Sequence, residues 1–208
     1  MSDQFADQPP GATPLNDISG LLNDSVFTRE DLDEVETENI YRAEEWLASA
    51  RIKDVFTVDF YRTLHCKMFE DVWDWAGILR TETCDQVGEP FVRAEMVSAE
   101  LGRVAMEYYR EWDELVDDEP ILPFLARYHH ALVLVHPFNN GNGRWSRLAT
   151  DAVLMFELDQ GPLEWGIEEG SLNVDSQERD DYIEALRCAD DYDFEALIAY
   201  LAEFNEEF

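Results

Sequence analysis

The sequence is poor in basic residues. Lysine and arginine together number 15 against 47 aspartate and glutamate residues, only Lys53 and Lys67 are lysines, and the formal net charge is −32. The phosphate backbone of a nucleic acid is an unfavourable partner for such a chain, because no basic patch is present to neutralise it. We therefore expect no nucleic-acid binding.

Cysteine is scarce, and long hydrophobic runs are missing. Cys66, Cys84 and Cys188 are odd in number and scattered without a CxxC pair, so neither a disulfide framework nor a zinc site is expected. The longest unbroken apolar run, residues 131–135, is too short to span a bilayer, and no basic-then-apolar leader opens the sequence. These features predict a cytoplasmic protein that does not enter a membrane.

Hydrophobic residues make up 46% of the 208 residues and aromatic residues 12%, which is enough for one well-buried core. This content is too high for a disordered acidic chain. A large negative charge repels itself in ordinary buffer, whereas the screening length falls to about 3 Å near molar salt. The composition therefore favours a folded protein from a salt-rich cytosol, with an acidic mesophilic protein as the alternative.

The chain divides into a polar start and one domain. Residues 1–27 are rich in Asp, Gly, Pro, Asn and Ser and predict a tail or arm, and residues 28–208 predict a single domain. Residues 78–93, around Gly88-Glu-Pro90, suit a short β-hairpin. Thr28 with Asp31 downstream resembles a helix entry. The spacing of apolar residues predicts helices over 29–50, from about Phe60 to before Gly77, and over 95–115, 121–135, 144–158, 176–189 and 192–206. The predicted fold class is all-α with a small β-hairpin flap.

One segment, His136-Pro-Phe-Asn-Asn-Gly-Asn-Gly-Arg-Trp-Ser-Arg147, combines features suited to a phosphate group. Pro137 disfavours helical geometry at the preceding residue, so the buried helix should end at about His136. Gly141-Asn142-Gly143 can take backbone angles closed to most residues and turn consecutive amides inward as a nest for an anion.

The next helix is expected to start at Arg144, with its positive end facing that nest. Arg144 and Arg147 then share one face of the first turn and can donate charge-assisted hydrogen bonds to phosphates. His136 beside such a nest is a candidate general base. Taken one at a time, these features would be interpreted as an ordinary tight turn, a structural histidine and surface charge. Their coincidence favours a phosphate site next to a base.

His129, His130 and His136 raise the alternative of a metal site. Adjacent residues point about 100° apart on a helix, so at most one of the first two can align with His136. No third ligand is evident, and a structural metal site is not expected.

The segment 136–147 resembles the signature of the Fic family, HPFx(D/E)GNGRxxR, and departs from it at Asn140 alone. Residues 69–80 resemble the family's segment leading into its flap, and residues 179–187 resemble its closing helix. The likeness thus covers about residues 28–208. Within the family the sequence is most similar to the group called mobile mystery protein B, which also tends to carry Asn before GNGR. The resemblance implies an all-α, Fic-type helical domain.

The resemblance further implies a protein nucleotidyltransferase that moves AMP from ATP to a Ser, Thr or Tyr hydroxyl of a target protein. His136 would deprotonate that hydroxyl, and Phe138 would anchor the loop. The target would dock along the flap, within residues 81–93, as an added strand. The residues implied to bind the nucleotide phosphates are Asn140, Gly141, Asn142 and Gly143 together with Arg144 and Arg147.

Asn140 stands where most active members carry the Asp or Glu that holds Mg²⁺. Its neutral oxygen implies weakened Mg²⁺ binding, since this ion prefers carboxylates and substrate phosphates. Two alternatives follow. One is a catalytically weak or inactive nucleotide-binding regulator, and the other is a toxin-like Fic protein that uses another phosphate-containing donor under a small regulatory partner. The retained His136 favours catalysis, because a binding protein needs no base.

Many Fic proteins also carry (S/T)xxxE(G/N) on a helix, where the glutamate pairs with the second motif arginine and blocks the γ-phosphate. Glu38-Asn39 matches the end of this pattern, although Glu34 stands at the Ser/Thr position. The resemblance implies that Glu38 is inhibitory. The alternative is a solvated helical side chain.

Overall fold

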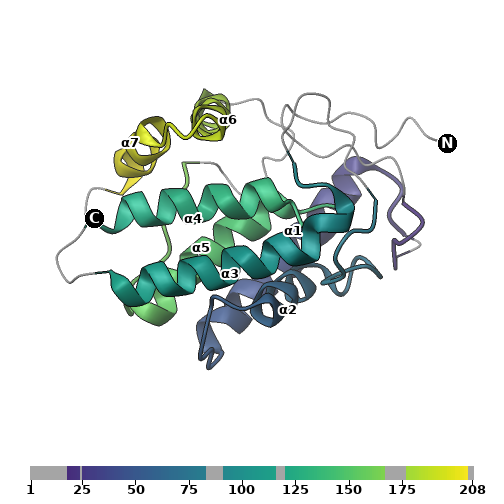
Figure 1. Cartoon of the computed structure of the whole chain (residues 1–208). Helices are drawn as coiled ribbons and strands as arrows, with labels where there is room; N and C mark the ends of the chain where they lie inside the picture. The colour runs from purple at the N-terminus through teal and green to yellow at the C-terminus, as the bar shows by residue number, and fades with distance from the viewer. Residues whose placement is uncertain (1–17, 24, 83–90, 116–119, 167–176, 206–208) are drawn as a thin grey trace.

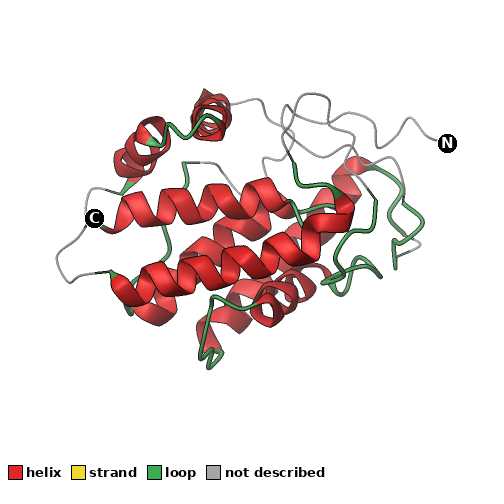
Figure 2. Cartoon of the chain, viewed as in Figure 1, coloured by secondary structure: helices red, strands yellow, loops and turns green. Residues whose placement is uncertain are grey.

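The structure, a computed structural model, describes residues 18–23, 25–82, 91–115, 120–166 and 177–205. Its regular elements are helices joined by loops (Figure 2). They are α1 (Arg29–Ser49), α2 (Val58–Phe69), the 3-10 helix η1 (Ala94–Met96), α3 (Val97–Glu114), α4 (Ile121–Val135), α5 (Asn142–Glu157), α6 (Gln177–Asp190) and α7 (Glu195–Phe204). Within these ranges no helix is both long enough and apolar enough to cross a membrane.

The predicted all-α class is confirmed for the described part of the chain, where the β pairing is one isolated antiparallel bridge between Leu21 and Trp73. The described residues contain no strand that would belong to the predicted flap. Residues 81–82 and 91–93 form no strand, and residues 83–90 lie outside the described residues.

Helix α4 is at the centre of the bundle, where it packs against α3, α5 and α7. Helices α1 and α2 pair with each other, and α2 also contacts α5. Figure 1 shows the α6–α7 pair along one side of the bundle next to α4, with α1 and α2 on the other side. The segment between α4 and α5, which carries the phosphate-binding pattern, therefore joins the central helix to a helix that also contacts α2.

Helix α1 begins with the capping box that its sequence predicts. The Thr28 hydroxyl accepts a hydrogen bond from the Asp31 amide at 3.1 Å, and the Asp31 carboxylate accepts one from the Thr28 amide at 2.9 Å. Both orphan amides at this helix end are thereby satisfied, which stabilises the first turn.

Several helix boundaries differ from those expected, and those of α2 and α7 have local causes. Helix α2 ends at Phe69 instead of continuing through Val72, because the amides of Val72 and Trp73 both donate to the Phe69 carbonyl and close a turn. Helix α7 begins at Glu195 instead of residue 192, because Tyr192 adopts a left-handed φ of 64° that separates it from α6. The turn after α2 also receives the polar start of the chain, since the Leu22 amide donates to the Val72 carbonyl at 2.9 Å.

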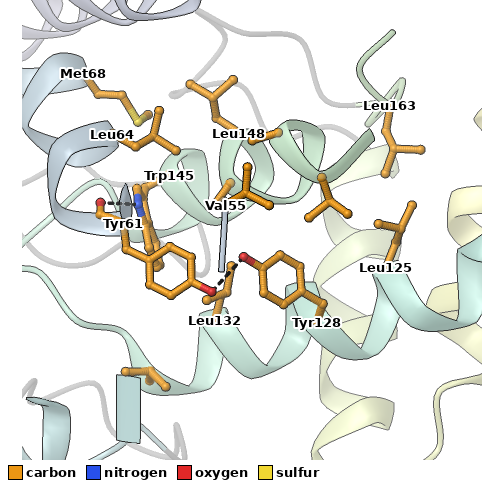
Figure 3. Close-up of a cluster of buried hydrophobic side chains, with 14 of the residues drawn as sticks. Val55, Tyr61, Leu64, Met68, Leu125, Tyr128, Leu132, Trp145, Leu148 and Leu163 are labelled. Carbon is orange, nitrogen blue, oxygen red and sulfur yellow. Dashed lines mark hydrogen bonds between the residues drawn. The ribbon is translucent and has the colours of Figure 1, made fainter. Parts of the chain in front are cut away.

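The core fixes the start of α5 against α2 and α4 (Figure 3). The hydroxyl of Tyr128 on α4 donates to that of Tyr61 on α2 at 3.0 Å, and the indole of Trp145 on α5 donates to the Tyr61 carbonyl at 3.0 Å. All three aromatic side chains are fully buried, so each polar atom needs such a partner. The loop before Trp145 thus joins two helices that are both held in the core.

Candidate active site

Helix α4 ends at His136, as Pro137 predicts. His136 adopts a left-handed conformation with φ 46° and ψ 59°, which takes the chain out of the helix before the proline ring could clash with it. Its side chain is 7% exposed, and the ring of Phe91 lies 3.9 Å away between centroids. The candidate base therefore lies at a sharp bend, covered by an aromatic ring.

Burial lowers the pKa of His136 from 6.5 to about 3, and the positive charge of Arg80 acts in the same direction. A hydrogen bond with the Val133 backbone opposes both effects without cancelling them. The imidazole is consequently neutral at physiological pH, the state in which it can accept a proton.

Arg80 fastens the chain on either side of residues 81–91 to the end of α4. Its Nε donates to the His136 carbonyl at 2.6 Å, and its backbone amide donates to the Pro137 carbonyl at 2.9 Å. A guanidinium nitrogen of Arg80 also donates to the Val92 carbonyl. The amide of Val92 in turn donates to the Leu134 carbonyl. We did not predict this role from the sequence. The available signal was an isolated arginine between a predicted helix and a predicted flap.

The loop between α4 and α5, residues 136–141, is closed by the side chain of Asn142, the first residue of α5. Its Oδ1 accepts from the Phe138 amide and its Nδ2 donates to the Phe138 carbonyl, both at 2.9 Å. The Phe138 ring is fully buried and stacks on the His65 ring at 3.7 Å, consistent with the expected anchor. Because the Asn142 side chain is occupied in this way, only its backbone amide remains to contact an anion.

His65, which sequence reasoning missed, orients the other half of the loop. Its Nδ1 accepts from the Gly77 amide at 2.9 Å, so its Nε2 carries the proton and donates to the Asn140 carbonyl at 3.1 Å. Burial lowers the pKa of His65 to about 3, which keeps the ring neutral. With its carbonyl fixed toward His65, the peptide between Asn140 and Gly141 cannot rotate freely.

The expected glycine geometry holds for Gly141 and is wrong for Gly143. Gly141 has φ 75°, and a Cβ there would lie 2.4 Å from the Phe69 ring. Gly143 instead lies inside α5, which starts at Asn142 and not at Arg144 as predicted. The start moves earlier because the Asn142 side chain clamps the loop and places its own residue in the first turn. The amides that begin α5 have no carbonyl one turn earlier, and Gly141 has no side chain to cap them.

The spacing of Arg144 and Arg147 predicts that both side chains lie on one outward face of the helix. In the structure both are largely buried instead. Arg144 pairs with Glu36 of α1 at 2.8 Å, with side chains only 12% and 2% exposed, and its guanidinium lies 5.0 Å above the Phe69 ring. The other Glu36 oxygen accepts from the Trp73 indole at 2.6 Å. Arg147 is buried, and its positive charge opposes the rise that burial causes in the pKa of Tyr182 on α6.

Glu38, the expected inhibitory residue, is not brought to the motif. Its side chain is exposed on α1, and its carbonyl accepts a hydrogen bond from Arg42 one turn later. Glu36 occupies the buried face instead. The sequence did contain a signal for it, because Glu36 falls one helical turn after Leu32 and one before Ile40, both buried, where an apolar residue is expected.

Asn140 provides one neutral side-chain oxygen, and that oxygen accepts the Gly141 amide at 2.6 Å. Among the residues that the structure describes, no group of three or more His, Cys, Asp or Glu side chains is placed to hold a metal ion. His129 and His130 contact Tyr182 and Asp190, respectively. The protein side chains alone therefore do not fit a Mg²⁺ site, and most ligands for such an ion would have to come from nucleotide phosphates and water.

Together these contacts create a small cationic region in a strongly acidic chain. Arg144 and Arg147 lie near the start of α5, whose positive dipole end adds to their charge, and Arg80 lies at the end of α4. A neutral histidine lies at the other end of the same loop. Such an arrangement suits an anion bound next to a proton acceptor.

Comparison with known proteins agrees with this site. Residues 55–154 match the family model described as the Fic/DOC family. The chain is 31% identical over 119 residues to the "Probable protein adenylyltransferase Fic" of Escherichia coli K12, covering 56% of this chain and 58% of that protein. It is 33% identical over 103 residues to the "Protein adenylyltransferase Fic" of Nematostella vectensis, covering 49% of this chain and 22% of that protein.

A solved structure of similar fold is the BepC effector protein of Bartonella tribocorum with bound AMPPNP. It has a TM-score of 0.68 and 16% identity, and the match covers 95% of both chains. This degree of identity supports the fold alone. The match to the family model, residues 55–154, includes the entire loop between α4 and α5. Residues 55–154 of the chain are therefore similar to the Fic/DOC family.

Proposed function

We propose that this protein transfers AMP from ATP to a Ser, Thr or Tyr hydroxyl of a target protein. The observation that carries the proposal is the neutral, buried His136 at one end of a loop whose other end is the uncapped, positive start of α5. The names of the relatives support the same class of reaction. Because the chain covers 58% or less of these two relatives, the activity is proposed for the Fic-like part.

In the proposed reaction His136 accepts the proton of the target hydroxyl as its oxygen attacks the α-phosphorus. A new O–P bond forms, the bond between the α-phosphorus and the bridging oxygen breaks, and pyrophosphate leaves. The amides of Asn142 and Gly143, joined by that of Gly141 on leaving the Asn140 side-chain oxygen, would hold the α- and β-phosphates, and Arg147 would hold the β- and γ-phosphates. Arg144 would join them only on leaving Glu36, since its guanidinium is paired with that carboxylate.

The target hydroxyl must also reach His136, which the Phe91 ring covers at 3.9 Å between centroids. Phe91 directly precedes Val92, which is attached to the end of α4 through Arg80. We propose that a docked target segment displaces this ring, so that the hydroxyl takes its place beside the imidazole. Exclusion of water by the same ring would limit hydrolysis of ATP when no target is bound.

A second candidate function is a nucleotide-binding regulator without transfer activity. Asn140 and the Glu36–Arg144 pair favour it, because the first lacks the charge that attracts Mg²⁺ and the second neutralises one motif arginine. Any Mg²⁺ in the site would then be held mainly by the nucleotide phosphates.

Label transfer separates the two functions. The protein is incubated with α-labelled ATP, Mg²⁺ or Mn²⁺ and high KCl, with and without a halophile lysate, beside His136→Ala and the matched histidine variant His130→Gln. His130 lies on the same helix but contacts Asp190. We expect labelled protein with wild type and His130→Gln and none with His136→Ala, whereas all three should bind ATP. Transfer that survives His136→Ala would overturn the mechanism, and ATP binding without transfer in any sample would support the regulator.

Asn140→Asp provides a further arm of the same experiment. The added carboxylate should tighten Mg²⁺ at the nucleotide and raise transfer at low metal concentration. An unchanged metal dependence would show that residue 140 does not limit metal binding.

A further inference from the structure

His65 on α2 is a polar side chain in an otherwise aromatic part of the core. It is fully buried, and three aromatic rings surround it at centroid distances of 3.7, 4.7 and 6.0 Å, those of Phe138, Phe69 and Trp75. An apolar side chain would fill such a place without the cost of burying two ring nitrogens. Both nitrogens have partners, in two separate segments of the chain, so the hydrogen bonds and not the packing distinguish a histidine here.

The direction of both bonds follows from Gly77. Its amide can only donate, so Nδ1 of His65 accepts this bond at 2.9 Å and the proton of the neutral ring is on Nε2. Gly77 is itself fixed, since its carbonyl accepts a bond from Nε of Arg62 at 3.0 Å and its φ is 73°. A Cβ there would lie 2.7 Å from the Arg62 carbonyl. Nε2–H of His65 therefore donates to the Asn140 carbonyl, at 3.1 Å.

This bond determines where the Gly141 amide points. The peptide between Asn140 and Gly141 is planar and trans, so its carbonyl and its N–H point in opposite directions. With the carbonyl turned to His65, the N–H lies on the other side of the peptide, where the Asn140 side-chain oxygen accepts it at 2.6 Å. Asn140 is only half-buried and Gly143 is exposed, so a ligand can reach this side of the loop and take the place of that oxygen.

We propose that His65 is a positioning residue for nucleotide binding, which fixes the Asn140–Gly141 peptide so that the Gly141 amide is presented to the α- and β-phosphates of ATP. The alternative is a histidine that only fills space in the core. The inference rests on the nucleotide-binding half of the proposed function and not on the transfer step. It also links the turn at Gly77 to the phosphate loop through a single side chain.

Three substitutions separate the two bonds of His65 from its volume. The side-chain amide of glutamine reaches about as far as Nε2, so His65→Gln keeps a donor for the Asn140 carbonyl. His65→Leu fills a similar space with no polar atom. The shorter amide of His65→Asn can still accept from the Gly77 amide but does not reach Asn140.

Titration calorimetry measures the affinity of each protein for ATP, and urea unfolding shows which variants are folded. We expect His65→Gln to bind ATP within about threefold of wild type. His65→Leu and His65→Asn should bind it roughly tenfold more weakly, because each loses a bond from an oriented amide to a charged phosphate. The matched control is His130→Gln, which changes a buried histidine paired with Asp190 of α6 and should bind ATP as wild type does.

The Gly141 amide signal in proton–nitrogen correlation spectra provides a readout that a loss of packing alone would not remove. At ATP concentrations that saturate each protein, this signal should shift in wild type and His65→Gln. It should stay in place in His65→Leu and His65→Asn, where the peptide is free to turn the amide away. If His65→Leu does not fold, the comparison of His65→Gln with His65→Asn gives the same answer.

Wild-type ATP affinity in His65→Leu, or a loss in His65→Gln as large as that in His65→Asn, would overturn the inference. A Gly141 signal that shifts equally in all four proteins would do the same. Absence of ATP binding by wild type would overturn it together with the proposed function. The expected pattern of affinities without label transfer would support the inference and remove only the transfer step.

Discussion

Gly141 is under two constraints that no other residue satisfies together. Its φ of 75° costs a side-chain-bearing residue roughly 1–2 kcal/mol, and a Cβ would lie 2.4 Å from the Phe69 ring. Overpacking of this kind adds about 1–3 kcal/mol. We therefore expect Gly141→Ala to lower the free energy of unfolding in urea by about 2–5 kcal/mol and to abolish measurable ATP binding.

Gly102→Ala is the control for this change. Gly102 lies in the interior of α3, and a Cβ there would meet nothing within 4 Å. Alanine should raise the free energy of unfolding by about 0.5–1 kcal/mol at such a site and leave ATP binding intact. A Gly141→Ala protein with wild-type stability and affinity would show that the loop can relax around a side chain.

Three buried histidines predict how stability depends on pH. Burial lowers the pKa values of His65, His129 and His136 from 6.5 to about 3. Between these two values the unfolded chain binds more protons than the folded one, so stability is fully present above pH 6.5 and is lost as the pH falls. Each histidine should contribute at most about 1.4 kcal/mol per pH unit.

Urea unfolding at fixed KCl between pH 7 and pH 5 measures this slope above the range where most carboxylates titrate. His136→Ala should reduce the slope by about 1.4 kcal/mol per pH unit. A slope that is the same with and without His136 would mean that this histidine has a similar pKa in the folded and unfolded chains.

At the scale of helices, the buried Glu36–Arg144 pair joins α1 to the start of α5. Removing one partner strands the other charge in a poorly solvated site, which costs about 3–5 kcal/mol, whereas replacing both by apolar residues is often nearly neutral. We expect Glu36→Leu and Arg144→Leu each to destabilise the protein strongly, and the double variant to be more stable than either. Urea unfolding of the four proteins measures the coupling.

The Arg42–Asp71 pair provides the matched surface control. It also links α1 to the turn after α2, at 2.8 Å, but its side chains are 49% and 58% exposed. Asp71→Asn should cost at most about 1 kcal/mol. Additive losses from the two leucine substitutions would contradict a coupled buried pair.

Local sequence signals predicted most of the helices but few of the contacts between them. Thr28 with Asp31 placed the start of α1, and Pro137 placed the end of α4, because caps and proline act within a few residues. Glu36 and Arg144 are separated by 108 positions in the sequence. The spacing of apolar residues within each helix does not predict which helix faces pack against each other. The same reason explains why His65 was not predicted as part of the site, although the motif itself was.

The glycines of the motif show a second limit of sequence reasoning. A GNG run permits left-handed angles at both glycines, but only Gly141 uses one. Gly143 is helical because the side chain of Asn142 closes the loop one residue earlier than the glycines alone would suggest. Glycine permits several backbone conformations, and the surrounding contacts determine which of them it adopts.

At the scale of the whole molecule, 47 acidic residues against 15 basic ones leave a net charge of −32. Some surface carboxylates do pair, as Glu100 and Glu107 do with Arg103, but exposed pairs contribute little and are screened by salt. With about three acids for each base, most carboxylates repel other carboxylates. Relief of this repulsion should therefore exceed the loss of the few pairs when salt is added.

We accordingly expect the midpoint of thermal unfolding to rise with KCl, steeply at first and then more slowly near molar concentration. The curve should flatten because the screening length falls from about 8 Å at 0.15 M to about 3 Å at 1 M, after which little repulsion remains to be screened. A preferential-exclusion effect of the salt would instead keep growing with concentration. Thermal unfolding measured from about 0.1 to 3 M KCl at neutral pH distinguishes these shapes. A midpoint that is flat or falls with KCl would support an acidic protein adapted to ordinary ionic strength.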